Sequence, residues 1–214
     1  MGQFCRLLMK KPTLQHSTSR IKQSLRLRAW LQSLLFALLG VWFCSATAHS
    51  QGILPTISSL DVPRYLGRWY EIAKFPNRFQ KQCVSDTSAD YALTPDGKLS
   101  VLNQCRVANG EWDKAVGLAK QVGDSQSAKL QVRFAPAWLS FLPFVWGDYW
   151  IVDLDDKYEL VAISEPRREY LWILSRTPAV DEATYKALLN RLTIIGLDVK
   201  KLEKSPQPLA TRQP

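Results

Sequence analysis

The stretch "LGRWYEIAKFPNRF", Leu66 to Phe79, decides the fold of this chain. A glycine stands two residues before Trp69, and a strand-like segment follows that ends in an aromatic and basic loop. Glycine adopts backbone angles that other residues avoid, so Gly67 marks the point where the chain turns into the strand. An indole of this size at the start of a strand needs an enclosed place, and the rest of the sequence indicates where that place is.

Further short runs follow the first one and alternate apolar and polar residues with a period of two. Turn sequences such as "TPDG", "VANG" and "LDDK" separate them without an intervening helix, which indicates antiparallel neighbours. Eight up-and-down strands can close into a barrel that has no exposed edge and encloses one small ligand. A sandwich is the alternative. The expected strands are 68–75, 83–93, 98–106, 112–121, 129–135, 148–154, 158–164 and 170–176.

A helical repeat of apolar residues follows the last strand and predicts one amphipathic α-helix packed on the outside of the barrel. Gly196 can end this helix. The fold class is therefore all-β, with one C-terminal helix. The repeat consists of Tyr185, Leu188, Leu189, Leu192 and Ile195.

The first 48 residues have the pattern of a secretory signal peptide, with seven basic residues, no acid and then an apolar run. Ala46 and Ala48 fit the small residues of a cleavage site, so we expect a mature chain that begins at His49 and lies in the periplasm, with outer-membrane association left open. An uncleaved anchor is the alternative. A lipid anchor at Cys44 is not expected, because the bulky Phe43 precedes it.

Cleavage changes the charge balance of the chain. The whole sequence has 28 Lys and Arg against 19 Asp and Glu, and loss of seven basic residues leaves 21 against 19, a net charge of +2. The basic composition is therefore no evidence for a nucleic acid partner. The expected division is a signal peptide 1–48, an N-terminal segment 49–59, a barrel domain 60–208 and a disordered tail 209–214.

Two cysteines remain after cleavage, in a chain expected to fold outside the reducing cytoplasm. Cys83 and Cys105 flank the "TPDG" turn at similar distances, so they are expected to form a disulfide across that hairpin. Closure of a loop of about 20 residues would stabilise the fold by about 3 kcal/mol. The mature chain has one histidine, His49, at its start, so we expect no metal site, no cofactor and no histidine-based nucleophile.

Three motifs in this order resemble the lipocalin family, in its bacterial lipocalin and apolipoprotein D group, over about residues 60–208. "LDVPRYLGRWYEIAKFPNRF" resembles the first conserved region, "VDLDDKYELVAIS" the second and "REYLWILSRTP" the third. The resemblance implies a lipocalin barrel that binds fatty acids or lysophospholipids. Its motif residues here are Gly67, Trp69, Asp155, Tyr158 and Arg176.

The up-and-down order places Trp69, Asp155 and Arg176 at one end of the barrel. We expect the indole to close the floor there, with a guanidinium over its face that contributes about 0.5–2 kcal/mol. These residues are interpreted as structural, and the ligand is expected to enter at the opposite end.

The opposite end collects the loops of the mouth, of which "APAWLSFLPFVW" is unusually apolar. It either plugs the barrel or forms a rim that admits a lipid tail or contacts a membrane surface. Basic residues near the mouth, Lys81 among them, could meet an anionic headgroup. The candidate ligand contacts are Trp138, Phe141, Phe144 and Trp146 in this loop, Tyr149, Trp150 and Trp172 inside, and Arg78, Arg167 and Arg168 at the mouth.

The sequence thus favours a binding protein that carries or stores lipids for the outer envelope. A structural envelope protein with a filled barrel is the alternative. A lipid-modifying enzyme is disfavoured, because the chain contains no "GxSxG" and its adjacent acids Asp155 and Asp156 lie in a turn at the closed end. A homodimer stays open.

Overall fold

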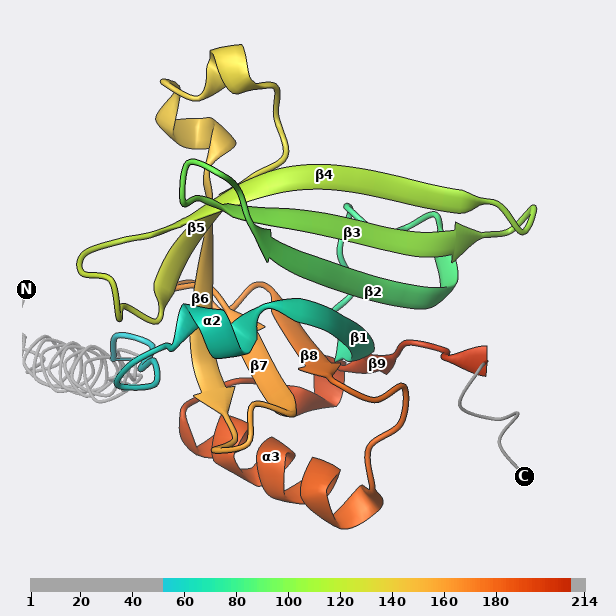
Figure 1. Cartoon of the computed structure of the whole chain (residues 1–214). Helices are drawn as coiled ribbons and strands as arrows, with labels where there is room; N and C mark the ends of the chain where they lie inside the picture. Colours follow the sequence, from blue (N-terminus) through green and yellow to red (C-terminus); the bar gives the residue numbers. More distant parts are fainter. Residues whose placement is uncertain (1–51, 209–214) are drawn as a thin grey trace, which may run out of the picture. The chain divides into compact units, whose positions relative to one another are not determined.

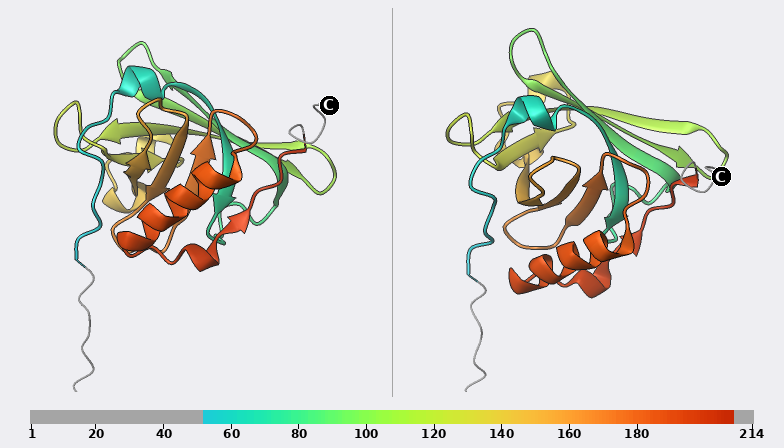
Figure 2. Two further views of the ribbon diagram at one scale, coloured as in Figure 1. Left: turned by 90° about the horizontal axis from the view of Figure 1, so that it is seen from below. Right: turned by 60° about the horizontal axis from the view of Figure 1, so that its bottom comes forward.

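In residues 52–208, which the computed structural model describes, nine strands form one antiparallel sheet that closes on itself (Figures 1 and 2). The strands follow the order β2-β3-β4-β5-β6-β7-β8-β1-β9, and a further pairing of β2 with β1 closes the barrel. The predicted eight-stranded antiparallel barrel with an outer helix is confirmed, and β9 adds one short strand to it. The expected signal peptide, Cys44 and the tail 209–214 lie outside the described residues. The strands are β1 (Gly67–Lys74), β2 (Cys83–Leu93), β3 (Leu99–Val107), β4 (Trp112–Gln121), β5 (Lys129–Arg133), β6 (Gly147–Leu154), β7 (Leu160–Ser164), β8 (Leu171–Ser175) and β9 (Glu203–Lys204).

Alternation along each strand separates an inner from an outer face of the wall. Residues directly opposite each other on paired strands share a face. Trp69 of β1 lies opposite Ala89 of β2, and both belong to the buried cluster that fills the lower barrel. A register shift between Glu71 and Ala73 then reverses the faces of β1, because a bulge inserts one extra residue. Glu71 therefore faces inward and Ala73 outward.

β1 changes its partner halfway along its length. Its first half pairs with β2, and its second half pairs with β9 (Figure 1). Beyond β9, the Ser205 amide donates to the carbonyl of Ile72 at 2.9 Å. The Gln207 side-chain amide donates to the carbonyls of Glu71 in β1 and Thr87 in β2, at 2.9 and 2.8 Å. The C-terminal segment thus bridges the first two strands where they separate.

The helix α3 (Glu182–Ile194) covers the outer face of the barrel (Figure 2). The Asp181 carboxylate caps its first turn, and Leu188 and Leu192 are fully buried against the outer face of β6, β7 and β8. Gly196, with φ at +86°, follows its end as the sequence predicted. Five small elements were not predicted: α2 (Val62–Tyr65), the single turns η1 (Ala137–Leu139), η2 (Pro143–Val145) and η3 (Val199–Lys201), and the short strand β9.

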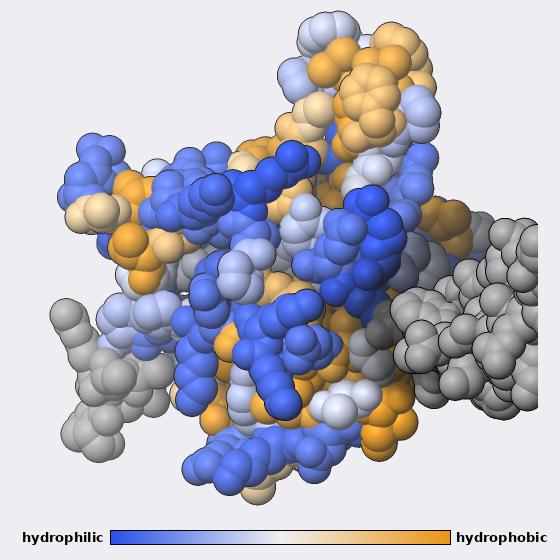
Figure 3. All heavy atoms as spheres, turned by 180° about the vertical axis from the view of Figure 1, so that it is seen from behind, coloured by the Kyte–Doolittle hydropathy of each residue, from blue (hydrophilic) through white to orange (hydrophobic). Residues whose placement is uncertain are grey.

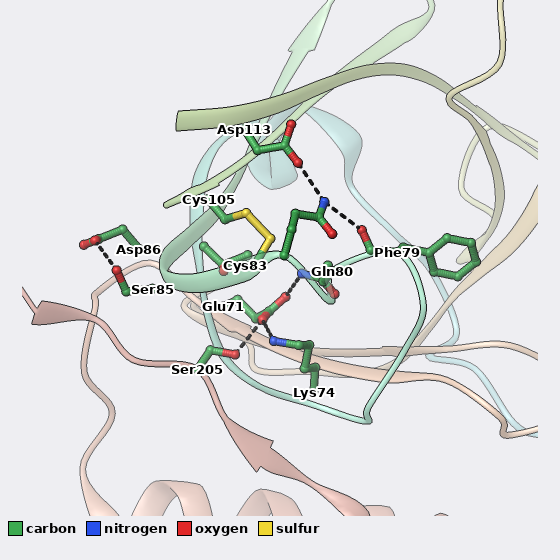
Figure 4. The surroundings of a disulfide bond; sticks show 12 residues. Glu71, Lys74, Phe79, Gln80, Cys83, Ser85, Asp86, Cys105, Asp113 and Ser205 are labelled. Atoms are coloured by element: carbon green, nitrogen blue, oxygen red, sulfur yellow. Dashed lines mark hydrogen bonds and ion pairs between the residues drawn. A yellow bond between two sulfur atoms is a disulfide. The ribbon is translucent and has the colours of Figure 1, made fainter. Parts of the chain in front are cut away.

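The predicted disulfide between Cys83 and Cys105 is confirmed, with the two Cα atoms 5.5 Å apart (Figure 4). The cysteines are not directly opposite each other, because Cys83 pairs with Val107. Two register shifts at the start of β2 bring the sulfurs together diagonally across the hairpin. The bridge ties β2 to β3 at the end of the hairpin away from its turn.

Candidate functional site

One end of the barrel is closed by the Trp69 indole and the Arg176 guanidinium. Trp69 is fully buried, and its ring centre lies 4.0 Å from Arg176 Cζ. The guanidinium also donates to three backbone carbonyls, those of Arg64 at 2.8 Å, Arg68 at 2.9 Å and Tyr158 at 3.2 Å. Partial burial lowers the pKa of Arg176. The guanidinium therefore joins the end of β8 to β1, to the helix α2 and to the β6–β7 turn across the floor.

The turn between β6 and β7 reaches the same floor. Asp155 accepts from three backbone amides of its own turn, among them Leu160 at 2.6 Å, and so fixes its shape. Tyr158 has a positive φ of 62°, and its hydroxyl accepts from the Asp61 amide at 3.0 Å. Gly67 has a φ of +91°, a backbone conformation that residues other than glycine rarely adopt, and it lies against the Arg176 guanidinium. All five motif residues thus lie at the closed end and face no ligand entrance.

Above the indole, three tyrosine hydroxyls meet on the inner face. The Tyr149 hydroxyl lies 2.8 Å from that of Tyr65 and 2.7 Å from that of Tyr91. Burial raises the pKa of Tyr91 to about 12, and it raises the pKa of Tyr65 and of Tyr149 well above the ordinary value of 10.0. The three phenols are therefore neutral at ordinary pH. We call Tyr65, Tyr91 and Tyr149 the tyrosine cluster.

The inner face of β4 becomes exposed toward the other end of the barrel. Ala119 of β4 is buried, whereas Ala115, two pairs higher on the same inner face, is exposed. Tyr149 and Trp172 both face inward, as register with Leu130 and Ile163 shows. These two of the expected liners therefore contact the lumen.

Trp150 does not line the lumen. It follows the inward Tyr149 on β6 and so points to the outer face, where Lys129 Nζ lies 4.5 Å from its ring centre.

Phe134 lies at the mouth of the barrel, a position that no sequence pattern predicted. A Cβ at Gly117 would lie 2.8 Å from the Phe134 ring, so only glycine lets this ring lie over the inner face of β4.

A buried carboxylate organises the mouth beside the disulfide (Figure 4). Glu71, only 2% exposed, accepts from Lys74 Nζ at 3.0 Å, Gln80 Nε2 at 2.6 Å and Ser205 Oγ at 2.5 Å. Gln80 in turn accepts from the Trp172 indole at 2.9 Å. These bonds hold the β1–β2 loop and the C-terminal segment against the lumen wall.

The apolar loop between β5 and β6 stands away from the barrel (Figure 1). Trp138, Phe141 and Phe144 are 72, 75 and 80% exposed, which excludes the loop as a plug of the lumen. A hydrophobic surface gathers on this projection, at the top of Figure 3. Trp146 at its base is half-buried, with Lys120 Nζ 4.2 Å and Arg133 Cζ 5.4 Å from its ring centre. The loop is thus an anchored, outward-facing apolar tip.

The expected cations of the mouth are only partly where the sequence placed them. Arg168 has a positive φ of 58° and points toward α3, where it donates to the carbonyls of Gly52 and Ile195. Arg167 is exposed and forms ion pairs with carboxylates of its own turn. The two arginines thus point to different partners, and their expected joint contact with a headgroup stays a prediction. Arg78 instead lies with Lys74 in a groove at the mouth.

In residues 52–208 no group of three His, Cys, Asp or Glu side chains is placed to hold a metal ion. None of the helices in that part of the chain is long and apolar enough to cross a membrane.

A comparison with protein families matches the part of the chain that forms this barrel, including Trp69 and Arg176 of its floor. The family described as "Lipocalin-like domain" covers residues 60–207. The chain is a lipocalin. The resemblance that the three motifs indicated is confirmed.

Related proteins extend across most of this lipocalin. "Temperature-induced lipocalin-1" of Arabidopsis thaliana is 46% identical over 156 residues, which cover 72% of this chain and 83% of that protein. "Outer membrane lipoprotein Blc" of Citrobacter freundii is 37% identical over 166 residues, 77% of this chain and 89% of that protein. "Apolipoprotein D" of Macaca fascicularis is 37% identical over 160 residues, with coverages of 72% and 80%.

Solved structures share the fold at lower identity. Insecticyanin from the tobacco hornworm Manduca sexta has a TM-score of 0.57 at 22% identity and covers 75% of this lipocalin and 87% of its own chain. The cockroach allergen Per a 4 has a TM-score of 0.55 at 20% identity, with coverages of 74% and 96%. Lipocalins bind small hydrophobic ligands and are in general not enzymes.

Sequence reasoning missed Tyr65, Tyr91 and Glu71 as lumen residues. Tyr91 could have been found from the alternation of β2, since it lies two residues from the inward Ala89. Tyr65 lies in the short helix α2 before β1, and no pattern in the sequence predicted that helix. Glu71 is a charged residue at an inward position of β1, and such a position in a strand is itself a signal of a buried polar network.

Proposed function

We propose that this lipocalin carries or stores fatty acids or lysophospholipids for the maintenance of the outer envelope, with the acyl chain in the lumen. The observation that carries the proposal is the closed barrel: its floor is formed by Trp69 and Arg176, and the inner face of β4 becomes exposed at Ala115 toward the other end. Each methylene that leaves water contributes about 0.8 kcal/mol, so the buried chain dominates affinity.

The apolar loop tip supports collection of the ligand from a membrane surface. Trp138, Phe141 and Phe144 form a protruding apolar surface at the same end as the mouth, and exposed apolar surfaces of this kind mark interaction sites. Lys120, exposed at the base of the loop, adds positive charge that favours anionic lipids. A lipid would then pass from the membrane into the lumen without crossing bulk water.

In this proposal, an acidic headgroup binds in the groove at the mouth. The groove has a volume of about 410 Å³, and Lys74, Arg78 and Lys81 line it together with Glu203. Exposed charge pairs contribute about 0–1 kcal/mol, so this groove orients the ligand more than it holds it.

Export to the periplasm is part of the same proposal. Its support is the basic and apolar N-terminus with the Ala46 and Ala48 cleavage pattern, and the relatives named as outer membrane lipoproteins. Mass spectrometry of the protein from the periplasmic fraction tests this, and the mature chain is expected to start at His49. Incorporation of labelled palmitate at Cys44 would contradict a cleaved chain without a lipid anchor.

The test of carriage is a titration with fatty acids of increasing chain length at a fixed headgroup, followed by quenching of tryptophan fluorescence. Affinity is expected to rise several-fold per methylene until the chain fills the lumen. An affinity that does not depend on chain length would favour the alternative, a structural protein with a filled barrel.

The loop is tested on vesicles of anionic phospholipid. Phe141→Ser with Phe144→Ser is expected to weaken vesicle binding at least about fivefold, since two exposed phenyl groups no longer leave water. Val116→Ser is the matched control, because Val116 is 71% exposed on β4 and does not belong to the loop. Equal vesicle binding by both variants contradicts the membrane contact and leaves carriage intact.

A further inference from the structure

The first half of β4 has a neighbouring strand on one side only. β3 pairs with β4 from Trp112 to Ala119, whereas β5 pairs with it only from Leu118 to Gln121. In Figure 1 this half of β4 runs along the margin of the sheet, away from β5. Every residue from Trp112 to Val116 is exposed. We call Trp112–Val116 the open edge.

The backbone groups of β4 point alternately toward β3 and toward β5, and a bond at each end of the strand shows which residues point where. The Val107 amide donates to the Glu111 carbonyl at 3.0 Å, so the odd-numbered residues bond to β3. The Val122 amide donates to the Lys129 carbonyl at 2.8 Å, so the even-numbered residues point to the side of β5.

The even-numbered residues of the open edge have no strand to bond on that side. Within residues 52–208, no group bonds to the outward amides and carbonyls of Trp112, Lys114 and Val116. A row of unpaired backbone donors and acceptors is a template for a further strand. An antiparallel strand added here would exchange a pair of hydrogen bonds with each of these residues.

The side chains of the open edge determine what the added strand must carry. Trp112 and Val116 are 41 and 71% exposed, and they lie on the outer face because Ala115 lies on the inner one. Lys114 lies between them, and Arg106 Cζ is 4.2 Å from the Trp112 ring centre. In the described part of the chain, neither Lys114 nor Arg106 forms an ion pair. The outer face thus presents an apolar, a basic and an apolar side chain in alternation.

A second copy of this chain fits the open edge poorly. Antiparallel pairing of two copies over the whole edge places Lys114 of each copy opposite Lys114 of the other. Like charges directly opposite each other destabilise a strand pair. An acidic residue opposite Lys114 attracts it instead, and apolar residues two positions before and after that acid lie opposite Trp112 and Val116.

We propose that the open edge binds an extended segment of another protein as an added strand, with an acidic residue between two apolar residues at alternate positions. Main-chain hydrogen bonds supply the affinity, and the three facing side chains supply the specificity. This inference goes beyond the carriage of lipids and does not depend on it.

The test uses fluorescent peptides of about nine residues, titrated with the full-length protein and followed by anisotropy. Threonine alternates with isoleucine in the peptide, except for a glutamate at its centre. Two methylated forms are matched controls. Methyl groups on the amides of the glutamate and its two nearest isoleucines block the edge that pairs with β4, whereas methyl groups on the threonine amides leave that edge intact. Hydrogen exchange of residues 112–116 locates the site.

Variants of the protein test the same contact from the other side. Val116→Pro removes one outward amide and no bond to β3, as an edge strand tolerates. Val116→Thr is its matched control, because it keeps the amide and the branched side chain. Lys114→Glu inverts the charge of the open edge. Thermal unfolding confirms that each variant is folded.

The plain and the threonine-methylated peptides are expected to bind alike and to slow the exchange of residues 112–116, and the other methylated peptide to bind about tenfold more weakly. Lysine in place of the peptide glutamate should weaken binding about threefold, and Lys114→Glu should reverse this preference. Val116→Pro should bind about fivefold more weakly than Val116→Thr.

Equal binding of the two methylated peptides, an unreversed charge preference or no binding of the plain peptide overturns the inference. A dimer of the protein that Val116→Pro abolishes also overturns it, because a second copy is then the occupant of the open edge.

Discussion

Removal of the Arg176 guanidinium is the sharpest test of how the barrel is closed. Arg176→Ala removes the cation over Trp69, worth about 0.5–2 kcal/mol, and the donor of three backbone carbonyls. A hydrogen bond contributes about 0.5–1.5 kcal/mol, and the low end applies because the acceptors lie near solvent and water can replace the donor. The free energy of unfolding should fall by about 2–4 kcal/mol, a large share of the 5–15 kcal/mol of an ordinary domain.

The assay is urea unfolding followed by tryptophan fluorescence and far-ultraviolet circular dichroism. Arg176→Lys keeps a cation near the indole but cannot donate to all three carbonyls. It should therefore lower the free energy of unfolding by about half as much as Arg176→Ala. Arg191→Ala is the control: its ion pair with Asp153 lies on the surface and should contribute less than about 1 kcal/mol. If Arg176→Ala lowers the free energy of unfolding by no more than Arg191→Ala does, Arg176 does not hold the floor of the barrel closed. A change in ligand preference at unchanged stability would instead mean that the floor has been placed at the wrong end.

Two further perturbations address other parts of the structure. Replacement of Cys83 and Cys105 by serine should lower the free energy of unfolding by about 3 kcal/mol, given a sequence separation of 22, and a reducing agent should then have no further effect on the melting temperature. Burial raises the pKa of Tyr91 to about 12, against 10.0 in the unfolded chain, so the folded state holds this proton more tightly. The free energy of unfolding should therefore be unaffected by this group below pH 10 and fall by about 2–3 kcal/mol as the pH rises from 10 to 12. Tyr91→Phe should therefore flatten unfolding free energy against pH in that window, and an unchanged slope in denaturant titrations would contradict the burial of this phenol.

The sequence was sufficient for features that depend on local patterns. Alternation predicted the strands, and the order of the turns predicted that Trp69, Asp155 and Arg176 meet. The disulfide followed from two cysteines that flank one hairpin, although its diagonal geometry depends on register shifts that no pattern shows. These features need only the strand order, and strand order is readable from turns.

The remaining errors come from long-range geometry. Trp150 and Tyr149 are neighbours on one strand, so both could not line the lumen, and only pairing with β5 shows which one does. Arg168 turns outward because its partners are Gly52 and Ile195, which lie on segments remote in sequence. The tyrosine cluster likewise joins elements that are distant along the chain. Side-chain direction depends on such partners, and a single sequence does not list them.

The two partners of β1 beyond its midpoint also constrain the order of folding. One edge of Ala73 and its neighbours pairs with β8, and the other edge pairs with β9, almost at the end of the described chain. During folding, β1 therefore keeps one unpaired edge until the C-terminal segment has docked on it. Long-range pairing of this kind slows folding, and an unpaired edge in the interim invites association with other chains. A chain truncated before Glu203 should thus be made at the usual rate and accumulate as aggregate.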